Sequence, residues 1–246
     1  MLDSGDYDEQ WNRLFDFIRF NPGARHRRRL IINALQRLNL SAPRILDVGC
    51  GLGFTIMALS QEIPDAHFHG VDFSPVAIEG ARSRFPEHDW TIGNIYSLGE
   101  LAAADVVICT EVIEHLDDWR GGLASVCQLV QVGGRMILTT QSGKVHATEQ
   151  AVGHLRHFKI EDLDQSLLGQ GFEIEQAVTW GWPGYVALKY VTNLNSEFAV
   201  EKLGSGKYGP ITRFLNGVVY RITRLTSLRN HPRGSQIMIV AVRKTK

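Results

Sequence analysis

Short apolar runs alternate along the chain with segments in which apolar residues recur at helical spacing. The apolar runs predict strands, and turn residues such as glycine bound most of them. We predict strands over residues 44–48, 66–71, 89–92, 104–109, 135–140, 172–180 and 235–243. We predict helices over residues 10–20, 24–40, 54–62, 75–84, 118–130, 159–168 and 211–228. This alternation is typical of a mostly parallel sheet with helices on both faces.

The last predicted helix lies in a long segment between the final two strands. Residues 181–234 are too many for an ordinary connection and predict a functional insert. Within 211–228 the apolar residues form one stripe, and Arg213, Arg221 and Arg224 lie off it. Two interpretations stay open: a lid that packs its apolar side on the body, or a contact with an anionic membrane or lipid-linked substrate.

Composition changes this picture little. The 246 residues are 44% hydrophobic and 21% charged, which is ordinary for a globular protein. No apolar run approaches the roughly 20 residues that a membrane span needs, and the acidic N-terminal segment does not resemble a secretory signal. The three cysteines fall in predicted core elements without a Cys-x-x-Cys spacing, which disfavours disulfides and structural zinc. We therefore predict a cytoplasmic protein.

The net charge of zero is unevenly distributed. Residues 181–246 contain eleven Lys and Arg against two Glu, a balance of +9, so the rest of the chain carries −9. Such asymmetry marks either an interaction surface or a basic segment packed on an acidic body. A second basic cluster, residues 25–29, either binds an anionic group or forms a solvated helix face.

The segment 45–53 carries the first candidate chemistry. Gly49, Gly51 and Gly53 follow a buried strand and open a helix, where glycine permits sharp turns and close approach to a ligand. The N–H groups of such a loop suit an anionic or polar ligand group. Phe54 stands where the dinucleotide fingerprint requires glycine, which counts against NAD and FAD.

Suitable residues also follow the next strands, at the edge where open α/β sheets bind ligands. Asp72 ends the second strand, where a carboxylate can accept hydrogen bonds from a ribose. Asn94 and Ile95 follow the third strand, and Thr110 and Glu111 follow the fourth. Asp72 or Asn94 alone could be a turn residue, but together these strand ends predict a nucleotide-like cofactor.

Three motifs in combination resemble the class I methyltransferases that use S-adenosylmethionine. They are residues 45–53, 70–74 and 111–116, and Gly153–Phe158 also fits small-molecule members. The resemblance covers residues 44–180 and implies a Rossmann-like, seven-stranded, mostly parallel sheet whose last strand, 235–243, is antiparallel. It further implies an N-terminal helical cover of the acceptor site over 1–43, a cofactor-binding core over 44–180, a basic cap over 181–234 and a final strand within 235–246.

The resemblance also implies roles for single residues. The methionine part of S-adenosylmethionine would lie at Asp47, Gly49, Cys50, Gly51 and Gly53, and the ribose at Asp72. Phe73 and Ile95 would flank the adenine, Asn94 would bond its amino group in place of the usual acid, and Thr110 and Glu111 would lie beneath the cofactor.

The implied reaction is methyl transfer to a small-molecule acceptor, with an oxygen of a glycan, lipid-linked or secondary-metabolite substrate favoured and nucleic acid disfavoured. The protein mainly aligns the acceptor, and a hydroxyl acceptor gains from a general base. The candidates are His115, His157 and Glu114, with Glu111 and His154 nearby. Glu114, His115 and His157 could instead be structural.

Three alternatives stay open. One is a non-catalytic protein that binds the cofactor as a sensor or scaffold, and another is an NAD-dependent oxidoreductase. In the third, Glu111, Glu114, His115 and one of the later histidines form a Mn²⁺ or Mg²⁺ site, a pattern of methyltransferases that act on the 2′-hydroxyl of small RNAs. We expect no metal.

Overall fold

A computed structural model of the chain describes residue 11 and residues 14–203 and 207–245. Eight strands form one sheet in the order β3-β2-β1-β4-β5-β8-β6-β7. They are β1 (Arg44–Val48), β2 (His67–Asp72), β3 (Asp89–Ile92), β4 (Ala104–Thr110), β5 (Val130–Gln141), β6 (Phe172–Pro183), β7 (Ser227–Arg229) and β8 (Gln236–Arg243).

The strand directions agree with the expected architecture. Strands β3, β2, β1, β4 and β5 pair in parallel, and β8 runs antiparallel between β5 and β6. The predicted fold class, a mostly parallel Rossmann-like sheet with an antiparallel last strand, is confirmed. The short strand β7, which pairs with the end of β6, is an addition that the sequence pattern did not predict.

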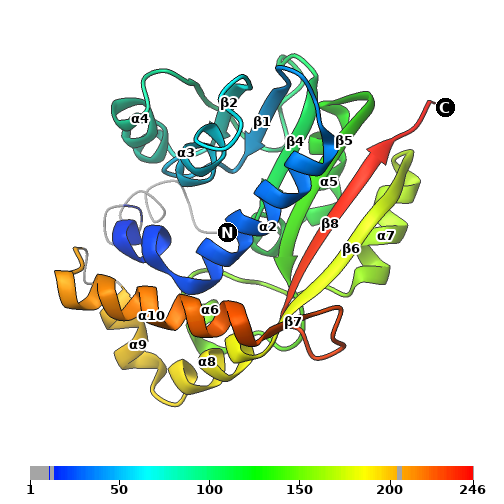
Figure 1. The fold of residues 1–246 in the computed structure, drawn as a ribbon. Coiled ribbons are helices and arrows are strands. Elements are labelled where there is room, and N and C mark those ends of the chain that lie inside the picture. Colours follow the sequence, from blue (N-terminus) through cyan, green and yellow to red (C-terminus); the bar gives the residue numbers. More distant parts are fainter. Residues whose placement is uncertain (1–10, 12–13, 204–206, 246) are drawn as a thin grey trace.

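Helices cover both faces of this sheet (Figure 1). They are α2 (Pro22–Leu38), α3 (Phe54–Ser60), α4 (Pro75–Arg84), the 3-10 turn η1 (Ile113–His115), α5 (Trp119–Gln128), α6 (Ala147–Gln150), α7 (Ile160–Gly169), α8 (Gly184–Asn193), α9 (Ser196–Leu203) and α10 (Pro210–Thr226). Residues 11 and 14–20 are helical as predicted, while residues 10, 12 and 13 lie outside the described part of the chain.

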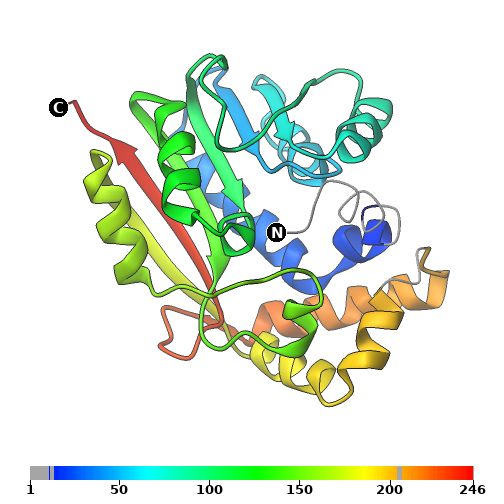
Figure 2. The same ribbon diagram turned by 180° about the vertical axis from the view of Figure 1, so that it is seen from behind.

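Alternation along the strands divides the core between the two faces. On β1, Leu46 and Val48 pack with residues of α5 and α7, which Figure 2 shows on the far side of the sheet. Ile45 points the other way and packs with residues of α2, α3 and α4. Asp47 shares the face of Ile45, since side chains alternate along a strand. A carboxylate therefore lies in an otherwise apolar layer.

One local expectation was wrong. Gly133 and Gly134 precede the strand predicted over 135–140, and such a pair predicts a turn, whereas the structure includes both glycines in β5. The pairing with β4 passes from Val130 directly to Arg135, so the residues between them interrupt the pairing without ending the strand. The insert contains α8 and α9 besides the predicted helix, which the structure places at Pro210–Thr226.

The insert forms a cap, defined here as α8, α9 and α10, at the end of the sheet where β5 finishes (Figure 1). Helix α10 lies beside α2 and α8, and α8 contacts β6. All three cysteines are buried free thiols. Within the described residues, none of the helices has both the length and the apolar character that a membrane span requires.

Candidate active site

The loop between β1 and α3 turns back sharply at three glycines. Gly49, Gly51 and Gly53 have φ values of 74°, 52° and 77°, a region that side chains rarely adopt. The N–H groups of Gly49 and Cys50 both donate to the carbonyl oxygen of Val71, at 2.7 and 3.0 Å. The loop is thereby tied to the carboxyl end of β2.

Asp72, at the end of β2, holds the same loop from its side chain. Its Oδ2 accepts from the N–H of Gly51 at 2.9 Å, and its Oδ1 accepts from the N–H of Ser74 at 3.0 Å. Asp72 is therefore more than a turn residue, because it fixes the glycine loop.

Asp47 lies beneath the loop with its side chain fully buried. Neither of its oxygens has a hydrogen-bond partner among the described residues. Burial, with a smaller contribution from the nearby Asp72, raises the pKa of Asp47 to about 7. A buried carboxylate without a partner is costly, so this group needs a cation or a donor from elsewhere.

A cavity of about 660 Å³ opens beside the loop. Trp11, Leu14, Phe17 and Ile18, together with α2, the glycine loop and the ends of β4 and β5, line it from one side, and α6, α8 and α9 from the other. The residues at its polar wall are Arg27, Arg28, Thr110, Glu111, His115, Gln141, Glu149, His154 and Lys189. It lies where the strand order reverses between β1 and β4, the usual place for a ligand in such a sheet.

The cavity brings together some of the predicted site residues and not others. Those that line it are Gly49, Cys50, Gly51, Thr110, Glu111 and His115. Those that do not are Asp47, Gly53, Asp72, Phe73, Asn94, Ile95, Glu114 and His157. Phe73 and Asn94 are exposed after β2 and β3, whereas Ile95 belongs to the core beneath α5. Asn94 makes a local turn, because its side-chain oxygen accepts from the N–H of Tyr96 at 3.0 Å.

Glu111 joins the strand ends to α2. Its carboxylate pairs with the Arg27 guanidinium at 2.8 Å and accepts from the side chains of Thr139 and Gln141. Its φ of 54° lies in the left-handed region, which is uncommon for a residue with a side chain. Local strain of this kind often accompanies a functional site. The loop after β4 is thus held in one shape by three bonds to the same carboxylate.

A second polar group ties the cap to the sheet. The Lys189 ammonium, on α8, pairs with Glu149 of α6 and donates to the side-chain oxygen of Gln141 at 3.1 Å. The other oxygen of Glu149 accepts from the N–H of His146 at 2.8 Å and lies 3.6 Å from Nε2 of His157. Lys189 and Glu149 are both buried, so each neutralises the other.

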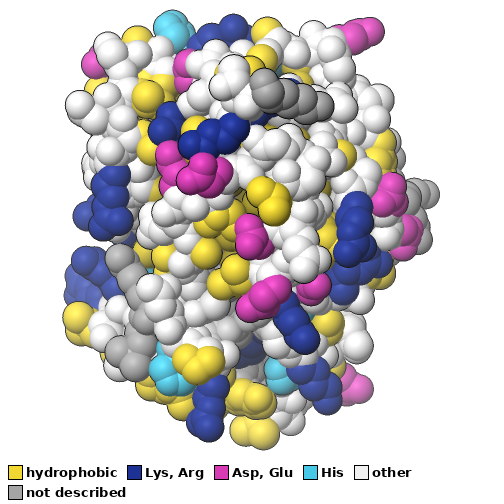
Figure 3. Space-filling view, turned by 90° about the vertical axis from the view of Figure 1, so that its right-hand side faces the viewer, with side chains coloured by type: hydrophobic (Ala, Val, Ile, Leu, Met, Phe, Trp, Pro, Cys, Tyr) yellow, Lys and Arg dark blue, Asp and Glu magenta, His cyan; other side chains and the backbone are white. Residues whose placement is uncertain are grey.

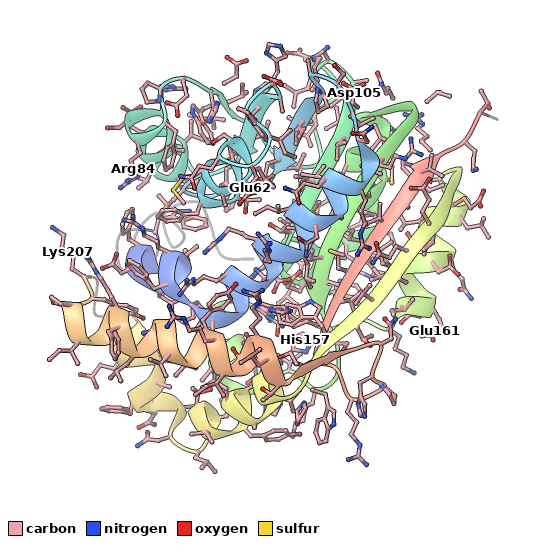
Figure 4. The ribbon with its side chains drawn as sticks, viewed as in Figure 1. Glu62, Arg84, Asp105, His157, Glu161 and Lys207 are labelled. Atoms are coloured by element: carbon pink, nitrogen blue, oxygen red, sulfur yellow. The ribbon has the colours of Figure 1, made fainter. Side chains whose placement is uncertain are left out.

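The candidate catalytic residues lie next to this group but differ in access. His115 lines the cavity, and its ring meets the ring of His154 edge-on at 4.7 Å. The side chain of His157 is fully buried behind His154, with their ring nitrogens 3.2 Å apart. Figure 4 shows His157 at the end of the sheet that faces the cap. Glu114 is buried and accepts from the Thr140 hydroxyl at 2.9 Å.

Burial decides the protonation of these groups. It lowers the pKa of His115 to about 4 and places the pKa of His154 well below its usual range, so both rings are neutral near pH 7. Burial, with the nearby Glu111, raises the pKa of Glu114. Of these residues His115 is the one predicted as catalytic that also reaches the cavity.

Three of these side chains also come close enough to share a metal ion. One ligand atom from each of Glu114, His115 and His154 lies within 4.8 Å of the others. Glu111, expected in the same set, instead pairs with Arg27. The expectation that no metal is used stays a prediction.

Sequence reasoning missed Gln141, Glu149 and Lys189 as cavity residues. Two of them carried a usable signal. Gln141 ends β5 as Asp72 ends β2, and Lys189 interrupts an apolar run in the insert. The basic cluster 25–29 was noted, and since Arg27 and Arg28 line the cavity, a purely solvated face is wrong for these two.

Comparison with known families identifies the central part of the chain. A family model described as a methyltransferase domain matches residues 46–136. The chain carries a methyltransferase domain. The matched residues include the glycine loop, Asp72 and the Glu111–His115 segment, so the predicted resemblance to class I S-adenosylmethionine-dependent methyltransferases is confirmed.

Relatives of this domain differ in what their names say they methylate. A ubiquinone biosynthesis O-methyltransferase of Aromatoleum aromaticum is 34% identical over 107 residues, 41% of this chain and 45% of that protein. A trans-aconitate 2-methyltransferase of Methylobacterium radiotolerans is 32% identical over 101 residues, 41% of this chain and 39% of that protein. The chain matches less than half the length of each relative, and the whole insert lies outside the match to the family model.

The fold extends beyond the matched residues. A magnesium protoporphyrin IX methyltransferase of Synechocystis, solved with bound S-adenosylmethionine, superposes with a TM-score of 0.58 at 17% identity. The superposition covers 90% of this chain and 80% of that one. At this identity the likeness shows a shared fold and leaves the acceptor open.

Proposed function

We propose that this protein transfers a methyl group from S-adenosylmethionine to a small-molecule acceptor, with an oxygen as the favoured acceptor atom. The observation that carries the proposal is the buried Asp47 carboxylate without a partner, directly beneath the glycine loop of a methyltransferase domain. The ammonium group of the cofactor's methionine part would supply the missing cation. When bound, the cofactor supplies a methyl group that is already activated as a sulfonium.

The residues of this chain would then bind and align the two reactants. The backbone of the loop Gly49–Gly53 and the carboxylate of Asp47 would hold the methionine part, and the Asp72 carboxylate, which fixes this loop, would meet the ribose. Phe73, Asn94 and Ile95 would frame the adenine. Exclusion of water from the cavity between the sheet and the cap, together with positioning, would account for much of the rate.

Among the predicted catalytic residues, His115 is our first candidate for contact with the acceptor, since it lines the cavity as a neutral ring. A neutral imidazole accepts a hydrogen bond from an acceptor hydroxyl, although a pKa of about 4 makes it a weak base. His157 and Glu114 lie behind it and would act by positioning His154 and His115.

The close approach of Glu114, His115 and His154 supports the alternative of a metal-dependent enzyme. Carboxylate and imidazole ligands suit Mn²⁺. An enzyme of this kind would lose turnover on dialysis against a chelator and regain it with Mn²⁺, whereas the metal-free enzyme that we favour would keep its activity.

The cofactor is tested by calorimetric titration with S-adenosylhomocysteine. We expect micromolar binding that Asp72→Ala weakens by about tenfold or more, because one carboxylate both shapes the loop and meets the ribose. Glu173→Ala, an exposed acid at the far end of β6, is the matched control and should bind as the parent does. Folded protein without any binding would refute the proposal. Binding without turnover on any small hydroxyl acceptor would favour the non-catalytic alternative.

The location of the protein and the role of residues 211–228 also stay proposals. We propose a cytoplasmic location, supported by three free and buried thiols. We also propose that residues 211–228 contact an anionic surface or a lipid-linked substrate.

A further inference from the structure

Helix α10 packs on the protein through its polar side. Thr223 is its one buried residue within the described chain, and the Thr223 hydroxyl donates to the carbonyl oxygen of Val219 at 2.9 Å. Gly184, at the start of α8, approaches so closely that a Cβ there would overlap the Thr226 side chain. Thr223 and Thr226 therefore lie on the inner side of α10, with Val219 and Tyr220 half-buried beside them.

The apolar stripe of α10 faces away from the protein. Its large members are exposed, at 76% for Ile211, 69% for Phe214, 54% for Leu215, 55% for Ile222 and 83% for Leu225. These residues recur at helical spacing along one side, the side that a helix normally turns toward the core. The interpretation of 211–228 as a lid with its apolar side on the body is therefore wrong.

More apolar surface lies on the other two helices of the cap and on their connection. Tyr190, Val191, Leu194 and Phe198 are between 56% and 85% exposed. With α10, this end of the molecule carries nine of the sixteen exposed large hydrophobic residues in the described chain. Figures 1 and 2 show the three helices grouped at one end, so the exposed apolar residues are concentrated there.

The charge around this stripe has one sign. Helix α10 contains Arg213, Arg221 and Arg224, all exposed, and no acid between Pro210 and Thr226. Arg213 pairs with Asp16 at 3.2 Å, whereas Arg221 and Arg224 form no ion pair with a described residue, and Lys207 lies just before the helix (Figure 4). In contrast, the face in Figure 3 mixes basic and acidic side chains. Exposed apolar residues beside basic ones fit an anionic lipid surface.

The cavity opens toward the same end. Val191 and Phe198 line it and are also 63% and 56% exposed, so they form part of its mouth. A molecule held in a lipid surface against the cap would therefore meet the mouth without crossing water.

We propose that α10 docks on an anionic lipid surface and that the cavity takes an acceptor with an apolar tail from that surface, past Val191 and Phe198. The second part rests on the proposed methyl transfer, while the docking stands without it. A second copy of this chain is the less favoured occupant, since a two-fold interface along α10 would bring Arg221 and Arg224 toward their own copies.

Co-sedimentation with vesicles tests the docking. We expect the full chain to bind vesicles of phosphatidylcholine and phosphatidylglycerol in equal parts, and to bind phosphatidylcholine alone at least about tenfold more weakly. The double variant Ile222→Asp, Leu225→Asp should lose binding to both. The matched control is Val132→Asp with Leu168→Asp, which adds the same charges at exposed apolar positions outside the cap. S-adenosylhomocysteine affinity should be equal in all three proteins, which shows that they are folded.

A label at the mouth tests the route. Because the native cysteines are buried, Phe198→Cys accepts a polarity-sensitive fluorophore at one site. We expect its emission to shift to shorter wavelength with anionic vesicles, and Val132→Cys, at an exposed position outside the cap, to show no shift. Equal binding of the α10 variant and the parent would overturn the docking, as would a dimer that this variant converts to monomer. If neither labelled variant shows an emission shift, the proposed route past Val191 and Phe198 is overturned. Failure to bind S-adenosylhomocysteine would count against the proposed function alone.

Discussion

At the scale of single residues, Asp47 shows how burial moves the pKa of an ordinary carboxyl group to about 7. It shares a face of β1 with apolar residues and lies close to Asp72. Burial therefore favours its protonated form in the free protein. Under the proposed function, the ammonium of the cofactor would favour the ionised form instead, so cofactor binding and proton release would be linked.

This linkage can be measured at pH 7. We expect S-adenosylhomocysteine to release roughly half a proton from Asp47 on binding, since the pKa of the carboxyl starts at about 7 and falls beside a cation. Calorimetry in two buffers of different ionisation enthalpy gives the proton count. In Asp47→Asn the release should vanish and the affinity should fall by about tenfold. A proton count of zero in the parent protein would contradict this role.

The same shift sets a pH dependence of stability. The pKa of Asp47 rises from 3.8 in the unfolded chain to about 7 in the folded one, so the folded state binds more protons between these values. The stability from this group is present below pH 3.8 and is lost as the pH rises to 7, by about 4 kcal/mol. Urea unfolding of the cofactor-free protein at pH 5 and pH 8 should show the loss, and Asp47→Asn should flatten it.

At the scale of elements, the close contact between α8 and α10 depends on a residue without a side chain. Gly184→Ala would place a Cβ against Thr226 and should lower the free energy of unfolding by about 2 kcal/mol. Gly217→Ala on α10 is the matched control. No described atom lies within 4 Å of its new Cβ, and alanine favours a helix by about 1 kcal/mol. Chemical denaturation should move the two variants in opposite directions, and equal effects would rule out the contact.

At the scale of the whole molecule, one buried ion pair joins the cap to the domain. Lys189→Met would leave Glu149 buried without its cation, and we expect the free energy of unfolding to fall by about 3 kcal/mol. Adding Glu149→Gln should restore part of this loss, because the uncompensated charge is then gone. Lys189→Arg, which keeps the charge, is the control. A Met variant as stable as the parent would show that the pair contributes nothing.

Local pattern predicted most of the architecture and the cofactor side of the site. Alternating apolar runs placed the seven main strands, and Gly49–Gly53 with Asp72 marked the carboxyl ends of β1 and β2. These signals are local, since a strand, a tight turn and the residue at a strand end all lie within a few positions of each other. Gly133 and Gly134 show the limit, because the same residue type serves a turn and an irregular strand.

The sequence by itself determined that this chain folds as a class I methyltransferase domain with a basic, amphipathic insert, because periodicity, glycines and charge are local properties. Only the tertiary structure decided which side of α10 faces out, that Lys189 and Gln141 share a wall with Glu111, and that Asp47 has no partner among the described residues. An amphipathic pattern predicts that a helix has a polar side and an apolar side. The surface on which the helix packs determines which of the two is buried. Here Gly184 admits the threonine side of α10, and the apolar side is left exposed.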